Sequence, residues 1–436
     1  MFLKAAAITL LLSSVSSVAL AADEPTDWVD PATGHRIVRL SKEPGSASLY
    51  FHQNAYFPDG NRMLITTPGG LSVVDLKTRE IQLVVPGIRN SMGSSAGIEV
   101  GRKTPTVYYQ RAENGQTAIY ATNIDTKETR KIAAIPAGAE FGGVNADETL
   151  IVGKCRAPAN AVLPPLPAAT APATAPATAP AIQSQPTAPR AGGLLQFFTA
   201  NIKTGEVKTF FPMREQLNHD QCSPTDPDLV LYCHEGEWHQ VDRIWTIHTD
   251  GTANKLMHPR TMEYEIAGHE FFSHDGQSIW YDLQTPRSSV FWLASVNVYT
   301  GQRLRYSIER SYWGVHYNVS WDGKLFSSDG GGPRSVANMS PLPQAKPLDP
   351  PQNGQWIYLL TPKNIPLETI KVANEDVKIG KFDVEKLVDL SKHNYEKAGG
   401  VEPNSTFTPD NKWLVFRSNL QGALHVYAVE IAKAKP

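Results

Sequence analysis

A recurring unit in the sequence restricts the fold more than any other feature. Each unit begins with a turn that contains Asp-Gly or a close variant and continues into an apolar strand, and a second strand, a polar hairpin and a third strand follow. The first half of the unit reads YFPDGNRMLIT from Tyr56, VNADETLIVGK from Val144, CSPTDPDLVLYC from Cys222, FFSHDGQSIWYD from Phe271, VSWDGKLFSSD from Val319 and FTPDNKWLVFRS from Phe407. Successive units lie about fifty residues apart, as expected for four-stranded propeller blades.

These units predict an all-β fold, a seven-bladed β-propeller whose terminal strands close the ring. A weaker unit at residues 106–109 brings the number of blades to seven. The last unit lacks an outer strand, and residues 35–40 can supply it, so that no sheet edge stays open. An array of β-sandwiches is the alternative. Residues 157–193, rich in Pro and Ala, predict a mobile extended insert, and the run at 362–390 also breaks the pattern.

The N-terminus has the pattern of a cleavable signal peptide. Lys4 precedes an apolar run, which ends in the small-x-small sequence of Ala19, Leu20 and Ala21. We therefore expect residues 1–21 to be removed and residues 22–436 to form the propeller in the periplasm or outside the cell. An uncleaved anchor is the alternative, and no later segment is a candidate for a membrane span.

Charge and cysteine content exclude further classes. A formal net charge of −2 over 436 residues gives no basic surface for nucleic acid. Three cysteines are too few for a disulfide scaffold, and in an oxidising compartment their odd number leaves at least one free. A bond between Cys222 and Cys233 stays open, but buried free thiols are favoured because Cys233 ends a strand-like run. The sequence predicts no particular oligomeric state.

A polar residue, usually histidine, recurs before the first strand of five units. Counted back from the Asp of each turn, these residues are His52, His219, His269, His316 and Asn404, with Glu402 close to the last. In a propeller this position faces one mouth of the central channel. Each histidine alone is explained as a local capping residue. Together, histidines and a carboxylate in one mouth have the chemistry of a metal site or of acid–base catalysis.

The second half of the His219 unit adds the sequence CHEGEWHQVDR at residues 233–243. It contains His234 and Arg243. Arg243 can hold a substrate carboxylate through two parallel hydrogen bonds. A surface or strand-edge arginine is the alternative.

The sequence resembles the oligogalacturonate lyases, seven-bladed propellers of pectin degradation. The resemblance rests on CHEG at 233–236 with VDRIW at 241–245, on GHEFF at 268–272, and on His316 ahead of SWDG at 320–323. It runs from about Trp28 to Val429 and leaves out the Pro/Ala insert. It implies β-elimination on a short uronic-acid oligomer, which gives a 4,5-unsaturated product.

The resemblance also implies roles for single residues. By position, His269 corresponds to the base that removes the C5 proton, and Arg243 to the arginine near the substrate carboxylate. His52, His219 and His234 are further candidates for substrate binding. The chemistry agrees, because imidazole removes so weakly acidic a proton only if a cation neutralises the adjacent carboxylate.

A divalent metal is the implied cofactor, and His316 corresponds to one of its histidine ligands. Residues 402–409 fall where the family carries a Gln and two further His ligands, but here Glu402 and Asn404 replace the histidines and the Gln aligns near Gly399. Oxygen donors suit a hard divalent ion, so we expect His316, Glu402 and Asn404 to bind Mn²⁺, the metal of the family, or Ca²⁺. A metal-free site is the alternative.

These observations predict a periplasmic or secreted carbon–oxygen lyase that acts on an acidic oligosaccharide. One alternative is a non-catalytic propeller that binds glycan or protein, since a fold alone does not fix a function. The other is a metal-dependent glycan hydrolase, which would give saturated products.

Overall fold

The computed structural model describes residues 25–88, 97–164, 193–332, 335–338, 355–363, 367–395 and 401–434. The regular elements in these ranges are strands and two short 3-10 helices, η1 (Arg310–Tyr312) and η2 (Val336–Asn338). The expected signal peptide at 1–21 lies outside the described residues, as does most of the Pro/Ala insert. In the described part of the chain, no helix has the length and apolar character needed to cross a membrane.

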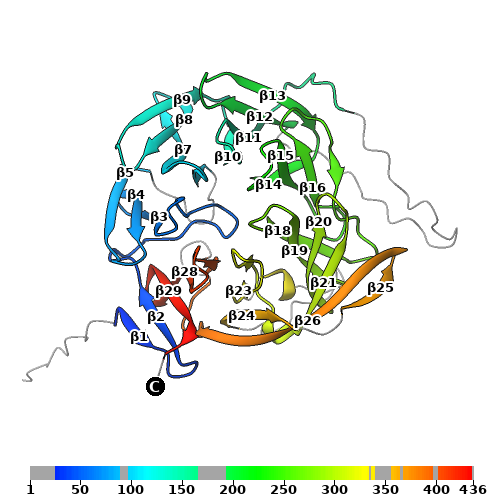
Figure 1. The fold of residues 1–436 in the computed structure, drawn as a ribbon. Coiled ribbons are helices and arrows are strands. Elements are labelled where there is room, and N and C mark those ends of the chain that lie inside the picture. Colours follow the sequence, from blue (N-terminus) through cyan, green and yellow to red (C-terminus); the bar gives the residue numbers. More distant parts are fainter. Residues whose placement is uncertain are drawn as a thin grey trace, which may run out of the picture.

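Small antiparallel sheets are arranged around a common centre, which is the arrangement of a β-propeller (Figure 1). Four of them are built from consecutive segments of the chain. Their strands are β3 (Arg62–Thr67), β4 (Gly70–Asp75) and β5 (Ile81–Pro86); β6 (Ile98–Val100), β7 (Thr106–Glu113), β8 (Gln116–Asn123) and β9 (Thr129–Ala134); β10 (Glu140–Val144), β11 (Leu150–Arg156), β12 (Leu195–Asn201) and β13 (Val207–Met213); β14 (Gln216–Cys222), β15 (Leu229–Glu235), β16 (Ile244–His248) and β17 (Lys255–Leu256). The predicted all-β propeller arrangement is confirmed.

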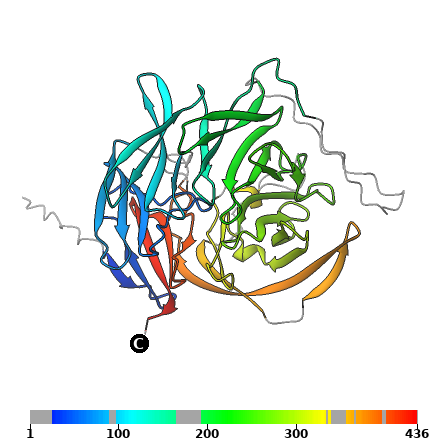
Figure 2. The same cartoon turned by 45° about the horizontal axis from the view of Figure 1, so that its top comes forward.

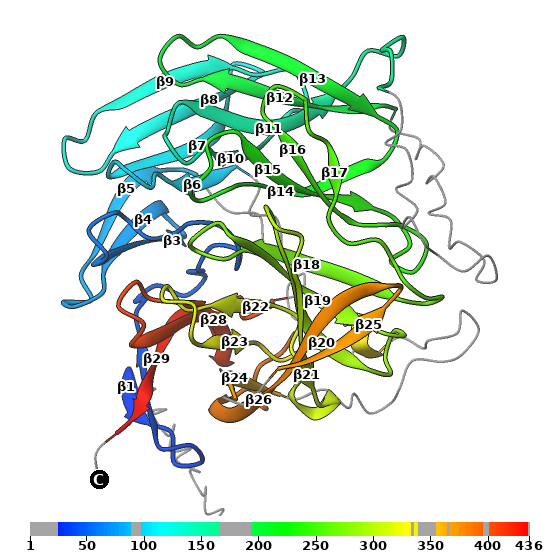
Figure 3. The same ribbon diagram turned by 45° about the vertical axis from the view of Figure 1, so that its right-hand side comes forward.

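One larger sheet departs from separate, repeated blades. It has nine strands: β18 (Ile266–Phe272), β19 (Ser278–Gln284), β20 (Phe291–Asn297), β21 (Arg303–Ile308), β22 (Tyr317–Val319), β23 (Phe326–Ser328), β24 (Trp356–Pro362), β25 (Glu368–Val372) and β26 (Glu375–Asp389). Strand β26 pairs in parallel with β21 and antiparallel with β24. Because it is 15 residues long, it bridges two groups of strands, as Figures 2 and 3 show for the orange ribbon. The described strands therefore form six hydrogen-bonded sheets, not seven separate blades.

The two ends of the chain share one sheet. It contains β1 (Asp27–Val29), β2 (His35–Arg39), β27 (Thr406–Phe407), β28 (Trp413–Gln421) and β29 (Ala423–Lys433). Strand β2 pairs antiparallel with β29, with Val38 opposite Ala428. The prediction that residues 35–40 supply the missing outer strand is therefore confirmed, and Figure 1 shows the blue and red ribbons side by side.

The repeated turns are held by the same local hydrogen bonds in different sheets. A hydroxyl group donates to the turn aspartate two residues later, from Ser273 to Asp275 (2.6 Å) and from Ser320 to Asp322 (2.7 Å). In the hairpin after the second strand, Asn297 Oδ1 accepts the backbone N–H groups of the second and third residues that follow it. Such Asx turns form within a few residues of sequence, which explains why the repeats are visible in the sequence.

Apolar side chains fill the space between neighbouring sheets. Leu64 and Val74 of one sheet, for example, belong to the same buried cluster as Val107 and Tyr109 of the next. The three cysteines are buried and free, in agreement with the favoured prediction of free thiols. This packing fixes the inner strands, which carry or adjoin the polar residues of the candidate site.

Candidate active site

The innermost strands of two neighbouring sheets each contain a bulge at a histidine. The pairing of β14 with β15 shifts register between Asn218 and Gln221, and that of β18 with β19 shifts between Gly268 and Phe271. Inside these bulges His219 and His269 have φ angles of 49° and 50°. A non-glycine residue adopts this left-handed conformation at a cost of about 1–3 kcal/mol. The bulges re-aim both side chains out of the normal alternation of the strand.

Four of the predicted histidines lie together. The ring centroids of His52 and His219 are 5.6 Å apart, those of His219 and His269 6.3 Å, and those of His269 and His316 5.0 Å. Tyr50 lies among them, with its ring 5.0 Å from His52 and 5.1 Å from His316. The spacing of the units thus brings residues from distant parts of the sequence into one cluster, the histidine cluster.

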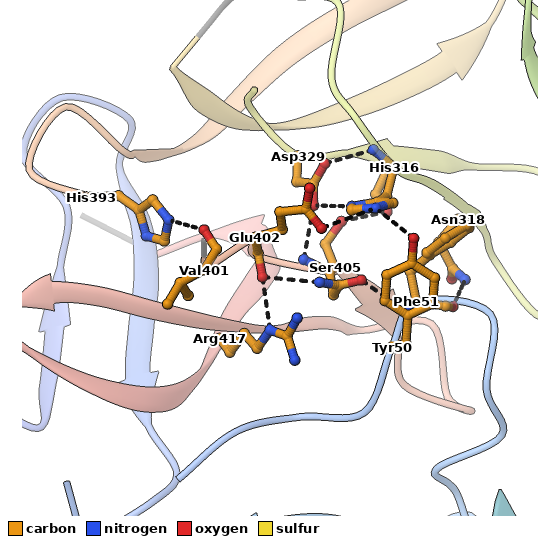
Figure 4. A network of polar contacts seen from close by, with 12 residues as sticks. Tyr50, Phe51, His316, Asn318, Asp329, His393, Val401, Glu402, Ser405 and Arg417 are labelled. Atoms are coloured by element: carbon orange, nitrogen blue, oxygen red, sulfur yellow. Dashed lines mark hydrogen bonds and ion pairs between the residues drawn. The ribbon is translucent and has the colours of Figure 1, made fainter. Parts of the chain in front are cut away.

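One end of the histidine cluster is strongly charged (Figure 4). His316 Nδ1 lies 3.0 Å from Oδ2 of the fully buried Asp329, whose other oxygen accepts the His316 backbone N–H at 2.8 Å. On its other side, His316 Nε2 lies 3.1 Å from the Tyr50 hydroxyl and 3.5 Å from Glu402 Oε2. Burial opposes the protonated imidazole, but Asp329 and Glu402 outweigh burial and raise the pKa of His316.

The predicted metal set is only partly assembled. His316 and Glu402 converge, as their separation of 3.5 Å shows. Asn404 does not join them, because its Oδ1 accepts the Phe51 backbone N–H (3.1 Å) and its Nδ2 donates to the Glu402 backbone carbonyl (3.0 Å). Within the described ranges, no three His, Cys, Asp or Glu side chains are arranged to hold a metal. The described structure thus brings His316 and Glu402 together, whereas the Asn404 side chain binds backbone groups.

Two other histidines of the cluster, His52 and His269, are neutral. Burial, followed by the neighbouring histidines, holds the pKa values of His269 and His52 well below their ordinary value. Both are therefore neutral at pH 7. The buried Nδ1 atom of His269 has no hydrogen-bond partner in the described part of the structure. A neutral imidazole is the form that accepts a proton, so His269 has the protonation state that a general base needs.

Arg243 lies directly before β16 and is 2% exposed. Its Nη1 donates to Glu235 Oε2 at 2.9 Å, and this pairing outweighs burial to lower the pKa of Glu235 to about 2. Its Nε and Nη2 atoms are buried and lack a partner among the described residues. These two atoms form the edge of the guanidinium that binds a carboxylate through two parallel hydrogen bonds.

Trp238 connects Arg243 with His269. The Arg243 guanidinium carbon lies 4.1 Å from the centroid of the Trp238 ring, and the His269 ring lies 5.2 Å from the same indole. Arg243 and His269 therefore both contact the indole of Trp238. A molecule that takes the place of the indole can meet a cation and a neutral base together.

Two other predicted residues have different surroundings. His219 Nδ1 lies 3.2 Å from Oε1 of the fully buried Glu270, without the alignment of a hydrogen bond. His234 stacks on Trp245 with ring centroids 4.7 Å apart, and no ring contact joins it to the histidine cluster in the part of the chain described. His234 is therefore not brought together with the other substrate-binding candidates.

Sequence reasoning missed several residues of the site. Tyr50 and Asp329 hold His316, and Trp238 lies between Arg243 and His269. Two of them had a signal in the sequence, because Tyr50 is two residues before His52 and Asp329 is the last residue of the repeat VSWDGKLFSSD. Trp238 had none, since its role depends on the path of the loop between β15 and β16.

Known proteins share sequence and fold with this chain. The family model described as oligogalacturonate lyase matches residues 194–435, which is more than half of the chain. The matched part contains His269, Arg243 and His316, but not His52.

Individual relatives cover nearly the whole chain. The oligogalacturonide lyase of Pectobacterium atrosepticum is 23% identical over 430 residues, which are 93% of this chain and 95% of that protein. The oligogalacturonate lyase of Dickeya dadantii is 22% identical with the same coverage. A solved structure described as oligogalacturonate lyase in complex with manganese matches with a TM-score of 0.68 at 20% identity and covers 93% of this chain and 96% of its own. At this identity, the structural match shows a shared fold.

Proposed function

Because the chain belongs to the oligogalacturonate lyase family and is a carbon–oxygen lyase, we propose a role for each site residue in β-elimination on short galacturonate oligomers. The observation that carries the proposal is the pairing of a buried cation with a neutral base. Arg243 offers a two-donor edge without a partner among the described residues, and the neutral His269 contacts the same indole as Arg243 does, that of Trp238. The uronate C5 carries both groups that these residues would meet, a carboxylate and a weakly acidic proton.

In this proposal Arg243 binds the carboxylate through Nε and Nη2. As His269 takes the C5 proton, negative charge moves into the carboxylate, so this pair is stronger in the transition state than in the ground state. The electrons of the C5–H bond form the C4=C5 double bond, the bond between C4 and its oxygen breaks, and the leaving oxygen takes up a proton.

A divalent ion, Mn²⁺ or Ca²⁺, is proposed to bind at His316 and Glu402. These two side chains supply one imidazole nitrogen and one carboxylate, and the bound ion would add positive charge beside the substrate carboxylate. Asn404 is left out of this set because its side chain binds backbone groups.

We also propose that the ring is best counted as seven blades. Dividing the nine-stranded sheet at β26 gives one group of strands from β18 to β21 and a second from β22 to β24. These two groups, with the other five sheets, correspond to the seven repeats of the sequence.

The test is ultraviolet absorbance during incubation with a panel of uronate oligomers, with and without Mn²⁺. A 4,5-double bond conjugated with the carboxylate absorbs where the substrate does not, so absorbance should rise with oligogalacturonate. The His269→Ala variant should lose turnover while its circular dichroism spectrum stays unchanged. Saturated fragments by mass spectrometry would indicate hydrolysis instead, and full activity of His269→Ala would refute the assignment of the base.

A further inference from the structure

Trp238 lies in the loop between β15 and β16 and is half-buried. Its indole forms a cation–π contact with Arg243, 4.1 Å from the guanidinium carbon to the ring centroid, and an edge contact with His269 at 5.2 Å. In the described part of the chain, no hydrogen bond holds the Trp238 side chain. Its contacts with described residues include these two ring contacts and its packing on Gly268.

Gly268 gives the indole the room for this position. A Cβ atom added at Gly268 would lie 2.5 Å from Trp238 Cζ3 and 2.7 Å from Cη2, and the three nearest atoms all belong to this ring. Gly268 does not have a left-handed φ angle, so its backbone conformation does not require glycine. The missing side chain matters here because the indole packs directly on the backbone of β18.

The two donors of Arg243 that a carboxylate needs, Nε and Nη2, are out of contact with solvent in this arrangement. The guanidinium carbon lies over the ring of Trp238, and His269 contacts the same ring. A ligand that contacts Arg243 and His269 at the position where both meet the indole has to displace the indole. Arg260 anchors the rest of the loop, since its Nη2 donates to the Gln240 carbonyl at 2.9 Å and its Nε lies 3.2 Å from Asp242 Oδ1. Only the tip of the loop has to move.

We propose that Trp238 is a displaceable cover that determines which carboxylates reach Arg243. This inference rests on the proposed function, because it takes Arg243 as the carboxylate-binding residue. A ligand that displaces the indole breaks its cation–π contact with Arg243, and every ligand must offset this loss when it binds. A uronate sugar replaces the contact with its carboxylate and its ring. A small carboxylate such as acetate has only its charge, so the cover excludes it.

Calorimetric titration of the full mature chain with galacturonate and with acetate tests the cover without requiring turnover. The wild type should bind galacturonate but not acetate at the same concentrations. The Trp238→Ala variant should bind galacturonate about 5- to 10-fold more tightly and should now bind acetate. Gly268→Ala, which pushes the indole away while keeping it in the chain, should change both affinities in the same direction. Trp28→Phe, in the distant β1, is the matched control and should behave as wild type.

Each other result decides against the cover. Weaker galacturonate binding by Trp238→Ala would mean that the indole contacts the sugar, and equal binding would mean that it plays no part. If neither the wild type nor any variant bound galacturonate, the proposed binding of a carboxylate by Arg243 would be wrong, and the cover with it. Failure of the proposed function alone would give a different result. Trp238→Ala would bind galacturonate more tightly than the wild type, but the wild type would produce no unsaturated product from any uronate.

Discussion

Replacing Arg243 with lysine tests whether activity depends on the positive charge alone or also on the paired N–H donors of the guanidinium. In the folded chain, Nη1 is already bound to Glu235 at 2.9 Å, which leaves Nε and Nη2 for a ligand. Lysine keeps one positive charge but cannot donate two parallel hydrogen bonds. The substrate carboxylate loses one or two charge-assisted hydrogen bonds, each of about 1.5–3 kcal/mol. A net loss of about 3 kcal/mol lowers kcat/KM roughly 150-fold.

The loss should appear mainly in kcat. The carboxylate gains negative charge as the C5 proton leaves, so the missing hydrogen bonds would have been strongest in the transition state. The assay is the initial rate of absorbance increase from the unsaturated product over a range of oligogalacturonate concentrations. An increase in KM alone would mean that Arg243 binds substrate and transition state equally.

The matched control is Arg303→Lys. Arg303, on β21, is also a largely buried arginine paired with one glutamate, Glu375, but it belongs to a different sheet from β16 and contacts none of the histidine cluster. The control should keep wild-type kinetics and show a similar change in thermal midpoint. The reasoning is refuted if Arg243→Lys stays within about threefold of wild type, or if Arg303→Lys loses as much activity.

Two further predictions concern protons and metal. Burial lowers the pKa values of His52, His258 and His269. Below about pH 6.5, therefore, the unfolded chain takes up protons at these histidines before the folded chain does. The free energy of unfolding should then decrease by up to about 1.4 kcal/mol per pH unit for each histidine as the pH falls. In the metal-free protein His316, with its raised pKa, acts in the opposite direction, since its stabilisation is complete below about pH 6.5 and is lost as the pH rises through its folded pKa. Urea unfolding of metal-free protein at pH 7 and 5 measures the sum, and equal stabilities would contradict it. Metal analysis of purified protein should find a divalent ion that His316→Ala has lost, whereas equally empty proteins would argue against a site at His316 and Glu402.

The features of the fold that the sequence predicted are those with local causes. The turn at Asp275 forms from Ser273 and its immediate neighbours, so the same few letters mark it in each repeat. The closure of the ring followed from the lack of an outer strand in the last unit. The joining of two groups of strands by β26 was not predictable, because a strand with partners on both sides depends on contacts between segments far apart in the sequence.

The same distinction holds for the candidate site. His219, His269 and His316 recur six or seven residues before the turn aspartate, so counting along the sequence was enough to find them. The same count found the position of Asn404, but it could not show that the side chain binds backbone groups. The Asn404 amide oxygen accepts a hydrogen bond from Phe51, 353 residues away in the chain, and no local pattern reveals that this acceptor is already used.

The two ends of the histidine cluster depend on each other electrostatically. Asp329 and Glu402 raise the pKa of His316, and the ring of His316 is 5.0 Å from that of His269. A positive charge at this distance disfavours a second one, and after burial His316 is the largest contribution that lowers the pKa of His269. The carboxylates at one end therefore help to keep the base at the other end in its proton-accepting form. Because Asp329 is fully buried beside His316, this arrangement is built into the fold and does not depend on the substrate.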